Sequence, residues 1–417
     1  MKKAVLRVAI FIHVLFLTGI CRADEIEELN KQMQELRQDY EAKIQKLQTQ
    51  IEGLAKKQEE KEVQLSAEIK ELKEVKGGLG LPENMHFHGY GELHYNNTSE
   101  EAKNDKMDFH RMVLGWSYLF SENIIFDAEV DFEHAATEIE LEYAKLDYLL
   151  SDAFNLRMGS MLMPVGYLNE FHEPVRFYSV ERPYVQRDVI PTTWQEGGLG
   201  IFGTPIPELN YRLYLVGGLD ASKFIASSGI RKGRGGVADA KADDLALVGR
   251  LEYSPVLGLD LGLSGYFGDA AQKNSSLGDA AVSLWEGDLR WRYKNLEFTG
   301  LIADIQIDDT QKINSLTGQV IGKEILGWYV EGAYHLGKLF LPENQDLVTF
   351  LRHEQYNTQE EVASGFSASP VNDRQVTTLG LAYYPIPQVA IKADLENWEN
   401  GAGQDWHQFN LGFGYEF

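Results

Sequence analysis

Hydrophobic and polar residues alternate along most of this chain, and the alternation is clearest in its last nine residues. Five apolar side chains there occupy every second position, with small or polar residues between them: Phe409, Leu411, Phe413, Tyr415 and Phe417 alternate with Asn410, Gly412, Gly414 and Glu416. A period of two places the apolar set on one face of a β-strand. Closing the sheet into a barrel removes the unpaired edge that such a terminal strand would leave.

From residue 85 onward the same pattern recurs in sixteen segments of about ten residues, near the length that crosses a bilayer at a tilt. These segments are 85–96, 107–120, 124–134, 138–150, 154–163, 194–203, 209–219, 244–254, 259–268, 283–294, 296–308, 325–337, 346–357, 374–385, 389–399 and 405–417. A soluble β-sandwich is the alternative, but there the charged face would be wet and the apolar face buried. We predict an all-β fold, a sixteen-stranded antiparallel transmembrane β-barrel at 85–417, preceded by an α-helical coiled coil.

The connections between these segments alternate in length. Residues 121–123, 151–153, 255–258, 294–295 and 385–388 form tight turns, whereas 164–193, 220–243, 269–282, 309–324 and 358–373 are longer. Outer-membrane barrels have short periplasmic turns and long outer loops. With an even number of strands, both ends of the barrel are expected in the periplasm.

The first 84 residues form a separate region. Residues 1–23 have a basic start, an apolar run and a small residue at Ala23, which predicts a secretory signal peptide containing the chain's single cysteine, Cys21. Apolar residues in 24–76 recur at alternating spacings of three and four, which predicts a periplasmic coiled coil; a lone charged helix or a spacer is the alternative. Residues 77–84 are Gly-rich and read as a linker.

Charge divides the chain sharply. The net charge is −24, and residues 1–76 contain fourteen basic and fourteen acidic residues, so the excess acid belongs to the barrel. Charges within the lipid band must face the lumen. We therefore expect pore-lining side chains at Asp127, Glu129, Asp131, Glu133, Glu138, Glu140 and Glu142 on one wall, and at Arg212, Arg250, Arg290, Arg292, Lys294, Arg352 and Lys392 on later strands. Opposed walls would sort polar solutes; salt bridges that stiffen the barrel are the alternative.

Two connections carry further basic residues. Residues 164–193 are long and rich in aromatic residues, and they form a candidate constriction loop that would place Arg176, Arg182 and Arg187 at the narrowest point; a surface loop is the alternative. Residues 231–234 form a basic cluster, which we interpret as a solvated loop with anion attraction or lipopolysaccharide binding as alternatives.

Enzyme signals are weak. No Ser-His-acid spacing or Gly-rich phosphate loop stands out, so we predict neither catalysis nor a cofactor. His86, His88 and His94 share one face of the first strand, a pattern that would suit a metal, but solvated lumen histidines are the simpler interpretation and no metal is predicted.

Several motifs resemble the phosphate-selective-type porin family: Leu156-Arg157-Met158-Gly159, Met163-Pro164-Val165-Gly166, Glu181-Arg182-Pro183 and Gly197-Gly198-Leu199-Gly200. The resemblance implies a sixteen-stranded, trimeric porin. Phosphate specificity in that family depends on lumen lysines and arginines, and the acid-rich wall here instead favours general diffusion.

The sequence thus predicts a homotrimeric porin of the bacterial outer membrane, in contact with lipid and lipopolysaccharide, for passive diffusion of ions and small polar solutes with a mild cation preference. It predicts no nucleic-acid partner. Two alternatives stay open: an envelope tether whose coiled coil contacts peptidoglycan, and a barrel that sheathes a periplasmic or redox partner.

Overall fold

The computed structural model describes residues 31, 34, 43, 82–101 and 103–417. The chain divides into two compact units, Met1–Glu83 and Asn84–Phe417. The predicted signal peptide (1–23) lies outside the described residues, as do most of the predicted coiled coil (24–76) and of the linker (77–84).

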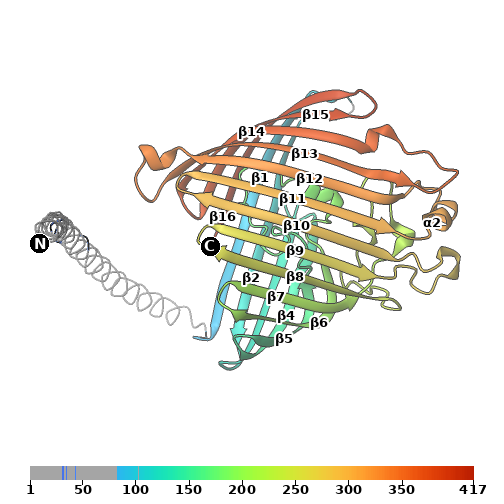
Figure 1. Ribbon diagram of the computed structural model, residues 1–417, viewed down its shortest axis with the longest axis horizontal. Helices are drawn as coiled ribbons and strands as arrows, with labels where there is room; N and C mark the ends of the chain where they lie inside the picture. The colour runs from blue at the N-terminus through green and yellow to red at the C-terminus, as the bar shows by residue number, and fades with distance from the viewer. Residues whose placement is uncertain (1–30, 32–33, 35–42, 44–81, 102) are drawn as a thin grey trace, which may run out of the picture. The chain divides into compact units, whose positions relative to one another are not determined.

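The second unit is a closed antiparallel barrel of sixteen strands, each paired with its neighbours in chain order, with β1 also paired to β16 (Figure 1). This confirms the predicted fold class. The strands are β1 (Met85–Thr98), β2 (Lys106–Leu119), β3 (Ile124–Glu133), β4 (Glu138–Ser151), β5 (Phe154–Leu162), β6 (Gln195–Ile206), β7 (Leu209–Gly217), β8 (Leu245–Val256), β9 (Leu259–Gly268), β10 (Val282–Tyr293), β11 (Leu296–Ile307), β12 (Gly322–His335), β13 (Asp346–Val362), β14 (Asp373–Ile386), β15 (Val389–Asn400) and β16 (Asp405–Glu416).

The C-terminal strand closes the sheet. Leu93 of β1 pairs with Phe413 of β16, and Gly89 exchanges two backbone hydrogen bonds with Phe417, at 3.1 and 2.9 Å. Neither strand has an unpaired edge, because every strand of the closed barrel is hydrogen-bonded to a neighbour on each side.

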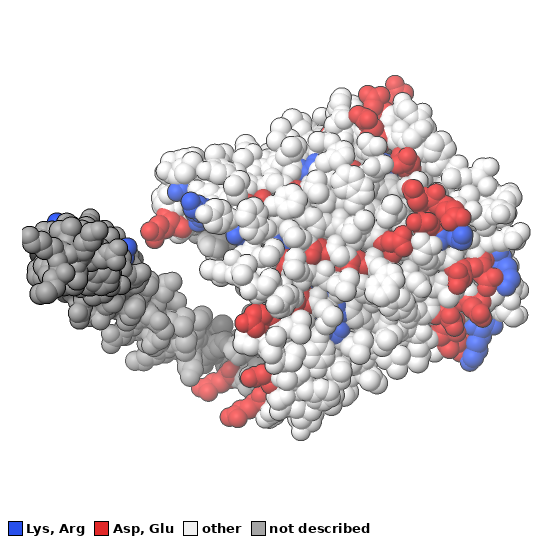
Figure 2. Space-filling model, in the orientation of Figure 1, with Lys and Arg blue, Asp and Glu red and all other residues white. Residues whose placement is uncertain are grey.

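The outer surface of the barrel is apolar. Outward side chains from strands all round the barrel are exposed, among them Leu199, Leu247, Leu263, Ile302, Leu351, Leu379, Ile391 and Phe413. On the face shown in Figure 2 most charged side chains gather over the loops, and the strand surface between them is largely uncharged. Such a continuous apolar belt is unfavourable in water and suits lipid. Charged side chains are excluded from it because an outward Arg or Lys at the bilayer midplane costs about 2–4 kcal/mol.

One end of the barrel carries short turns and the other carries long loops. We call these the short-turn end and the long-loop end; the short-turn end has one longer connection, residues 336–345, with a single helical turn η5 (Gly337–Leu339). A helix that the alternation pattern did not predict, α2 (Thr310–Thr317), lies in the long loop after β11. Among the described residues, no helix is both long and apolar enough to span a membrane.

Among the register shifts of the barrel, two lie in the wall formed by β1–β4 and change which side chains face inward there. The β1–β2 register shifts between Glu92 and Leu93, and the β3–β4 register shifts between Glu129 and Val130. Each β-bulge adds one residue to one strand and so reverses the inside–outside alternation beyond it. The consequence is local: strict alternation predicts the strands but misplaces side chains past each bulge.

Candidate functional site

Residues 163–194, called the inner loop below, fold into the barrel instead of covering its rim. Inward carboxylates on three strands accept hydrogen bonds from its backbone: the N–H of Gly166 donates to Glu286 of β10 at 3.3 Å, that of Val185 to Glu354 of β13 at 3.2 Å, and that of Val180 to Asp394 of β15 at 2.6 Å. A loop removed from bulk water must find partners for its backbone groups. These three inward carboxylates therefore have a structural role, since they hold the inner loop in place.

Side chains of the inner loop fasten it to further strands. The Tyr184 hydroxyl donates to Glu396 Oε2 at 2.8 Å, and the Tyr178 hydroxyl donates to Glu297 of β11 at 3.1 Å. On the opposite side, His172 Nε2 lies 2.8 Å from Glu142 of β4. The inner loop thus crosses the lumen from wall to wall.

An apolar cluster anchors the end of the inner loop toward β6. Its buried members include Tyr184, Val185, Val189, Ile190 and Trp194, which pack with inward side chains of the later strands. The single helical turn η1 (Val185–Val189) lies in this segment. Burial of five such side chains favours the docked loop, at about 1.5–3 kcal/mol for each fully buried large apolar group.

The three predicted constriction arginines all lie in the inner loop but differ in setting. Arg176 is half exposed and pairs with Glu416 of β16 at 3.2 Å. Arg182 is buried and donates to the Thr192 hydroxyl and to the His172 carbonyl within the loop itself. Arg187 pairs with its neighbour Asp188 at 3.0 Å.

The predicted acidic wall of β3 and β4 faces inward, and most of its carboxylates have basic partners. His88 lies 3.0 Å from Glu129, Lys145 lies 3.2 Å from Asp127, and the buried Arg111 lies 3.7 Å from Asp131 and 3.8 Å from Glu133. Glu142 pairs with the inner loop, while Glu138 and Glu140 are exposed near the long-loop end.

Arg111 and Lys145 were not among the predicted lining residues. Arg111 has the inward phase of β2, so the alternation could have identified it. Lys145 could not be found this way, because the bulge at Glu129 places it opposite Asp127.

The predicted basic residues of later strands also face inward, yet three of them are buried. Arg250 is 2% exposed and pairs with Asp288 at 2.7 Å. Arg352 is fully buried, with Nε 2.9 Å from Glu354. Lys392 donates to the Ser179 carbonyl at 2.9 Å beneath the inner loop.

The remaining basic residues of that group have more access to water. Arg212 pairs with Glu252 at 2.8 Å, Arg290 stacks on Tyr167, and Arg292 is largely exposed near Asp260. Lys294 lies on the short turn between β10 and β11.

The interpretation of residues 231–234 as a solvated loop is wrong for two of its arginines. Arg234 donates to the Thr192 carbonyl of the inner loop, and Arg231 lies 3.6 Å from Asp188. These contacts place the cluster over the inner loop, because the Thr192 carbonyl and the Asp188 carboxylate attract the guanidinium groups.

Cavities lie inside the barrel on both sides of the inner loop. Two cavities, of 920 and 500 Å³, open toward the short-turn end, and two others, of 320 and 800 Å³, lie toward the long-loop end. Phe177 contributes to the walls of both the 920 Å³ and the 320 Å³ cavity. Its ring centroid lies 3.8 Å from Lys392 Nζ, and Phe177 therefore stands between these two cavities.

A closed sixteen-stranded antiparallel barrel with an apolar exterior has the architecture of outer-membrane porins, and solved porin structures share its fold. OmpF of Salmonella typhi in complex with daunomycin covers 80% of this chain and 97% of its own at a TM-score of 0.54 and 10% identity. The outer membrane channel DcaP of Acinetobacter baumannii covers 80% and 97% at 0.53 and 12% identity. An anion-selective porin from Comamonas acidovorans covers 80% and 99% at 0.51 and 11% identity.

The sequence itself matches no family model. It is 35% identical over 325 residues to an uncharacterized protein of Aquifex aeolicus (strain VF5), which covers 73% of this chain and 74% of the relative. The chain belongs to the same family as that protein.

Proposed function

We propose that this protein is an outer-membrane channel through which ions and small polar solutes diffuse passively. The observation that carries the proposal is the inner loop, which crosses a lipid-facing barrel and leaves cavities of 320–920 Å³ on both of its sides. A barrel with an apolar exterior and a polar interior is suited to a membrane pore.

The inner loop would act as the constriction. Phe177 lies between the cavities of the two ends, and Lys392 Nζ lies 3.8 Å from its ring. A solute passing from the 320 Å³ to the 920 Å³ cavity would therefore pass Phe177. We propose that the predicted lining residues act on solutes mainly where they border the cavities, as Glu129 and Arg212 do in the 500 Å³ cavity.

Orientation and assembly follow as further parts of the proposal. Short turns at one end and long loops at the other favour a periplasmic short-turn end, which would also hold both ends of the barrel. The family resemblance favours a homotrimer surrounded by lipid and lipopolysaccharide. Residues 24–76 would reach into the periplasm toward peptidoglycan.

The test is single-channel conductance of the purified protein in a planar bilayer, with Phe177→Ala as the diagnostic variant. Wild type should give discrete open-channel currents, and Phe177→Ala should give larger ones because the constriction loses its ring. Phe171→Ala is the matched control: Phe171 lies on the same loop but is half exposed and borders only the two short-turn cavities.

Absence of conductance in wild type would contradict the channel. Equal conductance in Phe177→Ala and Phe171→Ala would contradict the constriction at Phe177. The sheath alternative is disfavoured because the chain's own loop occupies the lumen where a partner would lie. For the tether, conductance that stays normal after removal of residues 24–76 would separate the two roles.

A further inference from the structure

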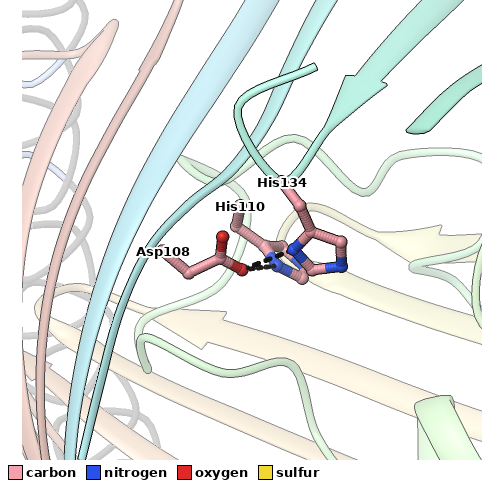
Figure 3. A group of neighbouring side chains, drawn as sticks. All are labelled: Asp108, His110 and His134. Atoms are coloured by element: carbon pink, nitrogen blue, oxygen red, sulfur yellow. Dashed lines mark hydrogen bonds and ion pairs between the residues drawn. The ribbon is translucent and has the colours of Figure 1, made fainter. Parts of the chain in front are cut away.

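Three side chains converge near the long-loop end of β2: Asp108, His110 and His134 (Figure 3). Asp108 Oδ2 lies 2.7 Å from His134 Nδ1 and 3.2 Å from His110 Nδ1. One ligand atom from each residue lies within 4.8 Å of the other two, and among the described residues this is the group of three such side chains that meets that spacing.

Two irregular backbone features bring these side chains together: the β1–β2 bulge and the turn between β3 and β4. The β1–β2 bulge skips His110 in the pairing, since Glu92 faces Arg111 and Leu93 faces Phe109. In a regular strand Asp108 and His110 would share the face opposite Arg111, whereas the extra residue brings them to the lumen side, where His110 and Arg111 both line the 320 Å³ cavity.

His134 belongs to a different element, the turn between β3 and β4. His134, Ala135 and Ala136 have φ angles of 49°, 55° and 66°, a left-handed run without glycine. Two backbone bonds hold this turn against β2: His134 N–H donates to the His110 carbonyl and Ala135 N–H to the Phe109 carbonyl, both at 3.0 Å. Strained backbone of this kind persists where the surrounding structure enforces it, and it is concentrated at functional sites.

A second layer fixes the position of His110. The His94 ring stacks on the His110 ring with centroids 4.8 Å apart, and His94 is itself held between Glu92 at 3.0 Å and Glu181 at 3.2 Å. Supporting contacts that fix the ring of a metal-binding histidine are typical of metal sites.

We propose that Asp108, His110 and His134 form a binding site for a divalent transition-metal cation, with Zn²⁺ the best match. Two imidazole nitrogens and one carboxylate oxygen are the donors that zinc prefers, and bonds of about 2.1 Å in a tetrahedral site place ligand atoms about 3.4 Å apart. Small side-chain adjustments from the present spacing satisfy that geometry, and the fourth position stays open to water.

The site is accessible to a dissolved ion. His110 and His134 both line the 320 Å³ cavity, and their side chains are 30% and 44% exposed. The Arg111 side chain beside them is neutralised by Glu92 at 3.1 Å, so its charge is compensated locally.

The test is isothermal titration of the full chain, purified in detergent without a polyhistidine tag, with ZnCl₂. We expect one saturable site per chain in wild type, and at least about tenfold weaker binding in His134→Gln and in Asp108→Asn. The matched control is His353→Gln, a residue on β13 whose Nδ1 bonds to Thr377 and which is not part of the cluster. Its zinc binding should equal that of wild type.

Co²⁺ absorption provides an independent readout, since a tetrahedral site gives visible bands that should disappear in both site variants. Circular dichroism identifies a variant that has failed to fold, and the other variant together with the wild-type Co²⁺ spectrum then decides. Absence of saturable wild-type binding, or unchanged affinity in a folded site variant, would overturn the proposal. Neither measurement depends on whether the barrel conducts.

Discussion

Arg352 is the largest charged side chain that this barrel buries completely. Its guanidinium lies between two carboxylates, 2.9 Å from Glu354 and 3.3 Å from Glu331, and Nη1 donates to the Ser179 hydroxyl of the inner loop at 2.6 Å. Charges withdrawn from water are tolerated only when paired in this way. The ion pairs around Arg352 therefore help to hold the inner loop against the barrel wall, in addition to any effect they have on solutes.

Arg352→Ala should therefore lower the free energy of unfolding by about 3–5 kcal/mol, because Glu354 and Glu331 would be left buried without a counter-charge. Guanidinium unfolding of the detergent-solubilised protein measures this. Arg292→Ala is the control: its side chain is 59% exposed, and the loss of such a surface pair should cost less than about 1 kcal/mol. Equal effects of the two variants would contradict the interpretation.

Asp188 on η1 joins three parts of the chain. Its carboxylate lies 3.0 Å from Arg187 of the same loop, 3.6 Å from Arg231 and 4.0 Å from Arg374 of β14, and it accepts a hydrogen bond from the Tyr356 hydroxyl at 3.0 Å. Burial raises the pKa of Asp188, but the three arginines outweigh burial and hold the pKa below its usual range.

The lowered pKa of Asp188 determines how the stability contributed by this residue depends on pH. A carboxyl whose folded pKa lies below its unfolded value of about 3.9 stabilises the fold fully above that value and loses the contribution as pH falls through the folded pKa. Asp188→Asn should thus be about 1–3 kcal/mol less stable than wild type from pH 8 to pH 5, with the gap narrowing below about pH 4. Unfolding curves at pH 7, 5 and 3 test this.

Asp239→Asn provides the control for that series, since Asp239 is exposed and borders none of the four cavities described above. Its stability should follow wild type at each pH. A gap between wild type and Asp188→Asn that persists unchanged at pH 3 would show that the carboxylate charge is not the cause.

At the scale of elements, β16 has glycines where the inner loop approaches it most closely. A Cβ added at Gly414 would lie 2.6 Å from Pro174 Cβ, and one added at Gly412 would lie 3.0 Å from the Val180 methyl groups. Strand glycines are often found where another backbone approaches. The small inward residues of the terminal strand therefore make room for the loop.

Gly414→Val should lower stability by about 1–3 kcal/mol, because the rigid Pro174 ring cannot yield and the inner loop must move. Gly332→Val on β12 is the matched control, since a Cβ there meets nothing within 4 Å, and it should be neutral or stabilising because valine favours strands over glycine. Guanidinium midpoints of the two variants distinguish these cases. A Gly414→Val barrel as stable as wild type would mean that the loop is not held tightly against β16.

The elements also show what a sequence can and cannot predict here. Alternation with period two identifies all sixteen strands because each has lipid on one side and protein or water on the other. Long β13 extends to Val362, past the predicted end at 357, since its last residues pair beyond the expected lipid band. Each such difference is confined to a strand end.

The contacts inside the barrel could not be predicted from the sequence as well as the strands could. Docking of the inner loop depends on contacts between residues such as Val180 and Asp394, which are 214 positions apart, and no local pattern encodes them. The meeting of His110 with His134 requires a bulge whose position the alternation does not reveal. The histidines that the pattern did single out are instead divided: His88 pairs with Glu129, and His94 supports His110.

For the whole molecule, the net charge of −24 does not describe the space through which solutes would move. The 320 Å³ cavity is lined by four arginines and four carboxylates, namely Arg111, Arg182, Arg187, Arg231, Glu92, Glu133, Glu181 and Asp188. Balanced charge in the cavity beside the constriction favours neither sign of ion strongly. The acidic excess lies elsewhere on the barrel.

We therefore expect weak ion selectivity with a mild cation preference. Under a KCl gradient across a planar bilayer, the reversal potential should lie near zero and on the cation side, and raising the total salt should reduce it further by screening. A potential close to that of a perfectly anion-selective pore would contradict this expectation and would favour an anion-specific role.

The inner loop also bears on the mechanics of the barrel. A sixteen-stranded barrel with nothing inside it is easily flattened into an ellipse, because the angle between each pair of hydrogen-bonded strands can change slightly. Here the same loop is tied to Glu142 on one side and to Glu354 and Asp394 on the other, so it works as a strut across the diameter. The cross-section is thereby held open by the segment that narrows it.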